Sequence, residues 1–146
     1  MKYLIFGLLL LLQAVCLSQT ETRDYGFQLE DSTFLIGDRY RTYKVIFEGY
    51  CYTKVSKSSE ETITEISEFL VKNNTVKVEI GYHLGNDTTL YSGCSPTLNA
   101  AESVKKELVA LGIENERMTV IGYGNSHPCC THPYRNQRLE IKVTEK

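Results

Sequence analysis

Cysteine and histidine, side chains that bind soft metals, are concentrated in one short segment of this sequence. His127, Cys129, Cys130 and His132 lie within six residues. Thiolate and imidazole groups suit zinc or copper, so this segment is a candidate metal site. Its spacing matches no standard pattern, and adjacent cysteines rarely bind the same tetrahedral ion. We therefore expect no metal, and a metal-binding protein remains the alternative hypothesis.

Disulfide bonding is the more ordinary use of the cysteines. Once Cys16 is removed with the leader described below, four remain: Cys51, Cys94, Cys129 and Cys130. An even number favours disulfides in an exported protein. A bond between the adjacent Cys129 and Cys130 is strained, so we expect each to pair with Cys51 or Cys94. The sequence does not choose among the possible pairings, and it contains no Cys-x-x-Cys motif that would favour a thiol-redox role.

Residues 1–18 have the pattern of a signal peptide. Lys2 precedes an almost wholly apolar run over residues 4–15, which is too short for a comfortable membrane span. We expect cleavage after Ser18. Lipidation of Cys16 is the alternative, disfavoured because the three residues before it make a poor lipobox. The sequence has no second apolar run, so we expect no transmembrane span in the mature chain.

The composition is that of a soluble globular domain. Of the 146 residues, 23% are charged and 42% are hydrophobic, which is too apolar for disorder. Sixteen Lys and Arg against eighteen Asp and Glu give a net charge of −2, which does not favour nucleic acid as a partner. No nucleophile–base arrangement and no paired carboxylates emerge from the sequence, so we expect a non-enzyme without a cofactor.

The hydrophobic periodicity predicts four strands and two helices that follow a loose N-terminal arm over residues 19–42, which holds a short edge strand near Phe34. In chain order these elements are a strand over residues 43–52, a helix from the capping box of residues 58–61 to Asn73, a strand over 76–80, a helix capped by Thr97 and ended by Gly112, and strands over 118–123 and 139–143. The order β-α-β-α-β-β predicts an α/β (α+β) two-layer sandwich with two helices on one face of a mixed sheet.

Several motifs of the chain occur in the order of one known family. Residues 122–128 read Gly-Tyr-Gly-Asn-Ser-His-Pro and residues 136–141 read Asn-Gln-Arg-Leu-Glu-Ile. They resemble the Gly-Tyr-Gly-Glu-Ser-x-Pro turn and the closing Asn-Arg-Arg-Val-Glu-Ile of the OmpA-like C-terminal domain, the peptidoglycan-binding module of Gram-negative envelopes. Residues 66–81 and 101–120 resemble its helix–strand units, and residues 34–38 look like the leading segment of Bacteroidetes members. The resemblance implies an OmpA-like domain over residues 43–146.

The resemblance also implies a ligand and shows where this chain departs from the family. Family members hold the diaminopimelate of the peptide stem by its zwitterionic end, with an Asp for the ammonium and an Arg for the carboxylate. Leu84 stands where the Asp belongs, Ala100 stands where the Arg belongs, and Gln137 replaces the first Arg of the closing motif. Both members of the charge pair are therefore missing.

Three residues of the family's site are kept, and they are the binding candidates that the resemblance implies: Tyr91, Asn136 and Arg138. We expect a non-enzymatic module of the cell envelope, periplasmic or associated with the outer membrane, whose diaminopimelate site is degenerate. Its partner would be peptidoglycan or an envelope protein. Retained peptidoglycan binding is the alternative, and it needs Asp87 with Arg135 or Arg138 to act from new positions.

Overall fold

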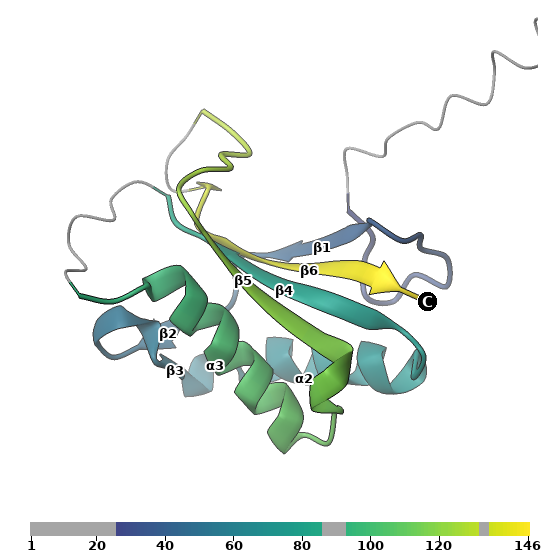
Figure 1. Ribbon diagram of the computed structural model, residues 1–146. Helices are drawn as coiled ribbons and strands as arrows, with labels where there is room; N and C mark the ends of the chain where they lie inside the picture. The colour runs from purple at the N-terminus through teal and green to yellow at the C-terminus, as the bar shows by residue number, and fades with distance from the viewer. Residues whose placement is uncertain (1–25, 86–92, 132–134) are drawn as a thin grey trace, which may run out of the picture.

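The computed structural model describes three stretches of the chain: residues 26–85, 93–131 and 135–146. Predictions that lie outside these residues are the signal peptide with Cys16 and Ser18, and the roles of Asp87, Tyr91 and His132. In the described part both α-helices lie on one face of a four-stranded sheet (Figure 1). The predicted α+β class, with two helices on one face of a mixed sheet, is confirmed.

The sheet has the strand order β1-β6-β4-β5. Its strands are β1 (Arg39–Thr42), β4 (Lys77–His83), β5 (Met118–Gly124) and β6 (Arg138–Glu145). β4 pairs in parallel with β5 and antiparallel with β6, and β6 pairs antiparallel with β1. This register sets Ile80 of β4 opposite Val120 and Ile141 at the centre of the sheet.

The helices α2 (Glu60–Lys72) and α3 (Pro96–Ala110) bury the apolar face of this sheet. Side chains without solvent exposure come from both layers: Ile66, Leu70, Val104 and Leu108 from the helices, and Val78, Ile80, Ile141 and Val143 from the strands. Their alternation in the strands and their helical spacing in α2 and α3 are the signals that the sequence carried. Within the described stretches, no helix is both long enough and apolar enough to cross a membrane.

Both helices begin near the predicted residues, but the predicted caps do not form. Ser59 is the N-cap residue of α2, and its hydroxyl accepts a hydrogen bond from the backbone N–H of Ile46 at 2.7 Å instead of capping the helix. Thr97 lies inside α3, where its hydroxyl accepts a bond from the N–H of Gly124 at 3.2 Å. Each hydroxyl therefore accepts a hydrogen bond from a segment distant in sequence and does not cap its own helix.

The end of α3 follows the prediction. Gly112 has φ +94°, which an L side chain rarely adopts. Its N–H donates to the carbonyl of Val109, and the N–H of Ile113 donates to the carbonyl of Leu108. This pair of bonds is a Schellman motif, which satisfies the last carbonyls of the helix and turns the chain toward β5.

The predicted strand over residues 43–52 is wrong. The segment forms half of a small hairpin, β2 (Phe47–Glu48) with β3 (Lys54–Val55), and a 3-10 turn, η1 (Tyr50–Tyr52), lies between them. Gly49, with φ +80°, ends β2 and starts this turn. The apolar and aromatic side chains of the segment suggested a strand of the main sheet, but β2 pairs with β3 instead, and the rings of Phe47 and Tyr52 pack against Tyr82 of β4.

The edge strand of the main sheet is β1, within the segment that was predicted to be a loose arm. No strand forms at Phe34, yet Phe27, Phe34 and Tyr40 are all buried in the core. The sequence Arg-Tyr-Arg-Thr of β1 alternates as a strand should, but its two arginines are charged residues within a segment that was predicted as an arm. They point to the sheet face without helices, where they find a carboxylate partner, as described below.

A glycine in β5 allows the sheet to approach the start of α3. A methyl group added at Gly122 would lie 2.5 Å from the backbone nitrogen of Leu98 and 2.7 Å from the hydroxyl oxygen of Thr97. Backbone cannot give way as a flexible side chain can, so we expect Gly122→Ala to lower the free energy of unfolding by about 2 kcal/mol or more. Urea unfolding of the purified protein measures this.

Gly112→Ala is the matched control, because nothing lies within 4 Å of its added methyl group and only the positive φ opposes it. We expect a loss of about 1 kcal/mol at that position. Equal losses of unfolding free energy for the two variants would show that the contact between β5 and α3 leaves room for the added methyl group.

Candidate functional site

Leu84 and Ala100, the residues expected at the family's charge-pair positions, lie close to the start of α3, and both are buried. Leu84 directly follows β4 and is 5% exposed, and Ala100, in α3, is 0% exposed. The N–H of Leu84 donates to the carbonyl of Gly124 at 2.8 Å, which extends the pairing of β4 with β5. Both side chains belong to the hydrophobic core cluster, so neither position offers a charged group to a ligand.

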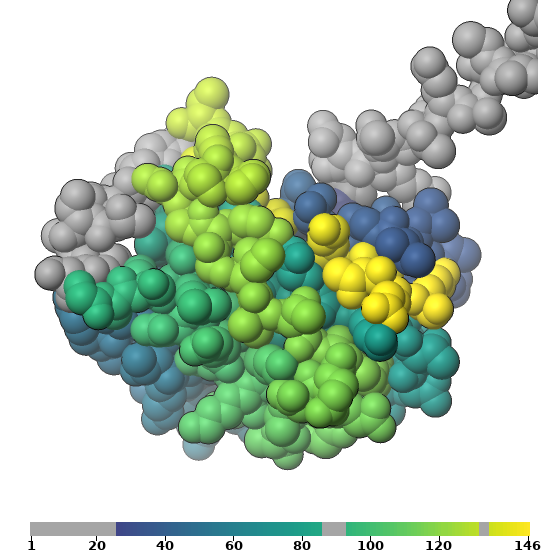
Figure 2. Space-filling model, viewed as in Figure 1, coloured from purple at the N-terminus to yellow at the C-terminus, as the bar shows by residue number. Residues whose placement is uncertain are grey.

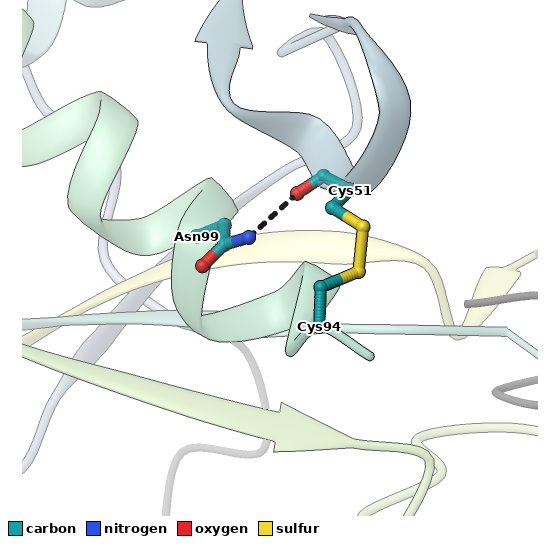
Figure 3. Close-up of a disulfide and its surroundings, with 3 residues drawn as sticks. All are labelled: Cys51, Cys94 and Asn99. Carbon is teal, nitrogen blue, oxygen red and sulfur yellow. Dashed lines mark hydrogen bonds between the residues drawn. A yellow bond between two sulfur atoms is a disulfide. The ribbon is translucent and has the colours of Figure 1, made fainter. Parts of the chain in front are cut away.

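The turn η1 lies on α3 beside Ala100. The side-chain amide of Asn99 donates to the carbonyl of Cys51 at 3.1 Å (Figure 3). The hydroxyl of Ser103 donates to the carbonyl of Tyr52, also at 3.1 Å. Asn99 and Ser103 occupy positions adjacent to Ala100 and one turn beyond it on the helix. Two polar side chains thus hold η1 against the N-terminal half of α3, beside Ala100.

The backbone of η1 is strained. Cys51 has φ 67° and Tyr52 has φ 58°, both in the left-handed region that L side chains avoid. Each such residue costs roughly 1–2 kcal/mol, so this conformation persists only where the surroundings hold it. The bonds from Asn99 and Ser103 are part of that support, and a disulfide is the other part.

The disulfide joins Cys51 of η1 to Cys94, which precedes α3 (Figure 3). The expectation that Cys51 and Cys94 would each pair with one of the adjacent cysteines is therefore wrong. Cys129 and Cys130 lie in the segment after β5, which projects from the body of the protein (Figure 2), whereas η1 and the start of α3 are in direct contact. Cys51 meets Cys94 because η1 packs on α3. The prediction of a strand over residues 43–52 placed Cys51 in the main sheet and so missed this contact.

Asn136, a retained family residue, holds the turn that contains the adjacent cysteines. Its side-chain oxygen accepts bonds from the backbone N–H groups of Cys129 at 2.8 Å and Cys130 at 3.1 Å. Its side-chain nitrogen donates to the carbonyl of Cys130 at 3.1 Å. Asn136 is buried and its amide is used on both sides, so its contacts are structural. A contact with a ligand stays a prediction.

On the sheet face without helices, a buried carboxylate is surrounded by arginines from two strands and by a histidine from a third. Glu140 of β6 accepts bonds from the guanidinium Nε of Arg138 at 2.8 Å and of Arg41 at 3.0 Å. Arg39 Nε lies 3.3 Å from the same carboxylate, and His83 Nε2 lies 3.5 Å from it. Glu140, Arg138 and His83 are buried, whereas Arg39 and Arg41 are partly exposed. The cluster links β1, β6 and β4 across the open face.

The electrostatics of the cluster favour the ionised carboxylate. Burial by itself raises the pKa of Glu140, but the polar contacts with His83 and with the Arg138 guanidinium outweigh it and lower the pKa from 4.5 to about 2. Glu140 is therefore charged at any physiological pH. Its negative charge offsets the surplus of arginines that surrounds it.

Arg138, the second retained family residue of the described part, is committed to this cluster. Besides Glu140, it donates through Nη1 to the carbonyl of Asn136 at 3.0 Å and through Nη2 to the carbonyl of His127 at 3.2 Å. These bonds fix both ends of the segment between β5 and β6 to the sheet. The arginine is buried, and its role as a ligand-binding residue stays a prediction.

Three aromatic rings stack beside the cluster. The imidazole of His83 lies parallel to the ring of Tyr123, with centroids 4.4 Å apart, and His127 packs edge-on against Tyr123 at 5.1 Å. The Tyr123 hydroxyl donates to Glu79 at 2.6 Å, and burial together with this carboxylate raises the pKa of Tyr123 to about 12. Gly81 makes room for the tyrosine ring, which would lie 2.5 Å from any added methyl group. His127 is thus a packing partner of this stack.

The described residues of the predicted metal-binding segment do not come together as a set of metal ligands. Within residues 26–85, 93–131 and 135–146, no three His, Cys, Asp or Glu side chains are arranged to hold a metal ion. His127 pairs with Ser126, whose hydroxyl lies 2.8 Å from Nδ1, and His132 lies outside these residues. Cys129 and Cys130 are the two candidate ligands that the structure does place together.

Two hollows open near the ends of β4 and β6. One, of about 310 Å³, is bordered by Tyr82 and by Tyr43, Phe47, Tyr52, Gln137 and Arg138 among others. The other, of about 360 Å³, is bordered by Leu84, Cys94 and the first turn of α3. Among the described residues, neither hollow is lined by an Asp or Glu. Arg138 is the one charged side chain among the described residues that line the first hollow, and its guanidinium is already bonded to Glu140, so the aromatic walls and the Gln137 amide there suit an uncharged group.

The sequence analysis missed the most highly connected residue, Glu140. Its position in a strand of alternating residues, Arg-Leu-Glu-Ile-Lys-Val, placed it on the face opposite the core, where a charged residue is ordinary. The signal that could have found it is the pair of arginines in β1, because they lie on the same face once β1 is paired with β6.

Comparison with known proteins identifies the fold. No protein-family model matches the sequence. No curated protein matches it either. Among solved structures, the periplasmic domain of Helicobacter pylori MotB is similar with a TM-score of 0.64 at 18% identity, over 76% of this chain and 84% of that one. The OmpA-like domain of FopA1 from Francisella tularensis gives 0.54 at 19% identity, over 77% and 80% of the two chains.

The peptidoglycan-associated lipoprotein of Burkholderia pseudomallei gives a TM-score of 0.55 at 16% identity, over 69% of this chain and 90% of that one. These similarities show that the protein has the fold of OmpA-like domains, as the motifs predicted. At such low identities the similarity concerns the fold, and the site must be judged from its own residues.

The Glu140 cluster gives a pH-dependent prediction. The pKa of Glu140 is lowered in the folded state, so the ionised carboxylate stabilises the fold by about 3 kcal/mol. This contribution is fully present above about pH 5 and is lost as the pH falls from about 4.5 toward 2. We expect Glu140→Gln to lower the free energy of unfolding by about 3 kcal/mol at pH 7, and the difference from the wild type to shrink toward pH 2. Urea unfolding across this pH range measures the difference.

Glu145→Gln, in the same strand, is the control. Glu145 pairs with Lys77 at 2.6 Å, but both side chains are exposed, so its loss should cost less than about 1 kcal/mol. A loss at Glu140 that is equally small, or that does not change with pH, would contradict the central role of the buried carboxylate.

The support of η1 gives a second prediction. Replacing both Cys51 and Cys94 with serine removes a cross-link between residues separated by 43 positions, and we expect a loss of up to about 4 kcal/mol from chain entropy. Asn99→Ala should cost about 1 kcal/mol, since it removes one hydrogen bond to the same turn. Unfolding in urea measures both. A double serine variant that is as stable as the wild type would show that η1 needs no cross-link to stay on α3.

Proposed function

We propose that this protein is a non-enzymatic, exported module of the cell envelope whose OmpA-like scaffold no longer holds diaminopimelate through the family's charge pair. The observation that carries the proposal is the burial of Leu84 and Ala100, the two positions of that pair, in the hydrophobic core. The envelope context is supported by the similar structures, which include a periplasmic domain and a protein named for its association with peptidoglycan.

The change at Ala100 goes further than the loss of one charge. A family member would extend an arginine from this point of α3, but here η1 covers the neighbouring helix surface and is fixed by Asn99, Ser103 and the disulfide. An arginine at position 100 would have to displace this turn or bury its charge, which costs several kcal/mol without a partner. The site is therefore remodelled, which supports a different ligand over simple weakening of the old one.

The remaining polar groups do not replace the pair. Arg138 is occupied by Glu140 and by two backbone carbonyls, so retained binding would depend on Arg135 and on Asp87, which lies outside the described residues. The hollow beside Tyr82 and Gln137 favours an uncharged ligand group, for example part of another envelope component or a protein side chain. We propose this hollow as the place where the ligand face now makes its contacts.

Co-sedimentation with purified peptidoglycan sacculi tests the proposal. Each lost charged hydrogen bond costs about 1.5–3 kcal/mol, so we expect binding several hundred-fold weaker than that of the peptidoglycan-associated lipoprotein run alongside as the positive control. Free diaminopimelate should not change the small fraction of this protein that pellets.

Gln137→Arg is the matched variant, because position 137 is exposed and tolerates the family's arginine without burying it. We expect it to fold and still not to gain diaminopimelate-sensitive binding, since no ammonium acceptor has been restored. Pelleting of the wild type at the level of the positive control, with release by diaminopimelate, would refute the proposal. Asp87→Ala and Arg135→Ala would then locate the shifted site.

A further inference from the structure

The adjacent thiols of Cys129 and Cys130 are held in an arrangement that the proposed function does not use. Their sulfur atoms lie 3.6 Å apart, which is contact distance for two sulfurs that are not bonded to each other. A disulfide requires about 2.05 Å, so the sulfurs need to approach by only about 1.5 Å. The pair is therefore close to bonding geometry even though the sequence lacks a Cys-x-x-Cys motif.

The backbone beneath the two thiols is fixed by a buried group. Asn136 accepts bonds from the N–H groups of both cysteines and donates to the carbonyl of Cys130, and it is itself 6% exposed. Arg138 holds the carbonyls on either side of this turn, those of His127 and Asn136. The backbone that carries the two thiols is thus tied to the sheet through Asn136 and Arg138.

The two thiols differ in their surroundings. Cys129 is exposed, whereas Cys130 is only partly exposed and its sulfur lies 3.6 Å from the side-chain oxygen of Asn136. The Cys129 sulfur lies 3.4 Å from the carbonyl of Arg135 and is a neighbour of the Tyr43 hydroxyl. An external reactant reaches Cys129 first, and Cys130 is positioned to react second.

We propose that Cys129 and Cys130 form a thiol–disulfide exchange site that takes a low-molecular-weight disulfide as its oxidant. The Cys129 thiolate attacks one sulfur of the external disulfide, forms a mixed disulfide and releases one thiolate, which takes up a proton from water. The Cys130 thiolate then attacks the Cys129 sulfur and releases the second thiolate. This second thiolate also takes up a proton, so the protein loses two protons and two electrons, and the external disulfide gains them and becomes two thiols.

The chemistry of the product suggests why such a pair differs from Cys51 and Cys94. A disulfide between adjacent residues closes a small ring around a peptide bond and is strained, so it is easily reduced back to two thiols. Cys51 is buried and its partner Cys94 is partly exposed, and the bond between them closes no such strained ring, so we expect it to exchange more slowly. One disulfide of the protein is therefore a structural cross-link, and the second is exchangeable.

Oxidised glutathione is the probe that tests this. Trypsin releases residues 118–135 as one peptide that contains both cysteines and no other cysteine. After mild reduction and exposure of the wild-type protein to oxidised glutathione, this peptide should be about 2 Da lighter and should carry no glutathione. In Cys130→Ser the second step is absent, so a glutathione adduct about 305 Da heavier should accumulate on Cys129.

Cys129→Ser is the matched control, and it should react at least about tenfold more slowly than Cys130→Ser because the remaining thiol is less accessible. Circular dichroism and an intact Cys51–Cys94 cross-link show that both variants are folded. A stable glutathione adduct on the wild type, or equal reactivity of the two single variants, would overturn the proposal. Disulfide-linked dimers as the main product would overturn it too. None of these readouts depends on binding to sacculi, so this test stands apart from that of the proposed function.

Discussion

The contacts of the buried Glu140 carboxylate with its arginine neighbours organise the sheet face that carries no helices. The carboxylate draws Arg39 and Arg41 to β6, and so fixes the edge strand that the N-terminal segment contributes. Through Arg138 it also controls the segment after β5, because that arginine binds carbonyls on both sides of the adjacent cysteines. A charge buried this deeply is tolerated only because several cationic and polar groups surround it.

On the opposite face, the packing of η1 on α3 is the second constraint. Asn99 and Ser103 offer polar groups to the turn, and the disulfide holds a backbone in the left-handed region. Ala100, between these two polar residues on the helix, is fully buried in the core. The turn, the start of α3 and the cross-link therefore form one packed unit, and the OmpA-like fold by itself does not fix what this face binds.

How far the sequence could predict the structure varied from residue to residue. The helices and three strands followed from their periodicity, and Gly112 ended α3 as expected, because local backbone and burial preferences agree with the fold there. Ser59 and Thr97 were predicted as caps, yet they bind neighbouring segments, since a hydroxyl can serve either partner and only proximity decides. The prediction of a strand over residues 43–52 failed because aromatic and β-branched residues suit any half-buried surface.

The sequence by itself determined the α+β fold and the resemblance to OmpA-like domains, because hydrophobic periodicity and residue identity are properties of the chain alone. Only the tertiary structure decided which cysteines meet, since the pairing depends on η1 lying on α3 and not on spacing along the chain. It also decided that Asn136 and Arg138 have structural tasks and that Glu140 is the centre of a charge cluster. Such roles arise from groups that are distant in sequence and adjacent only after the sheet has formed.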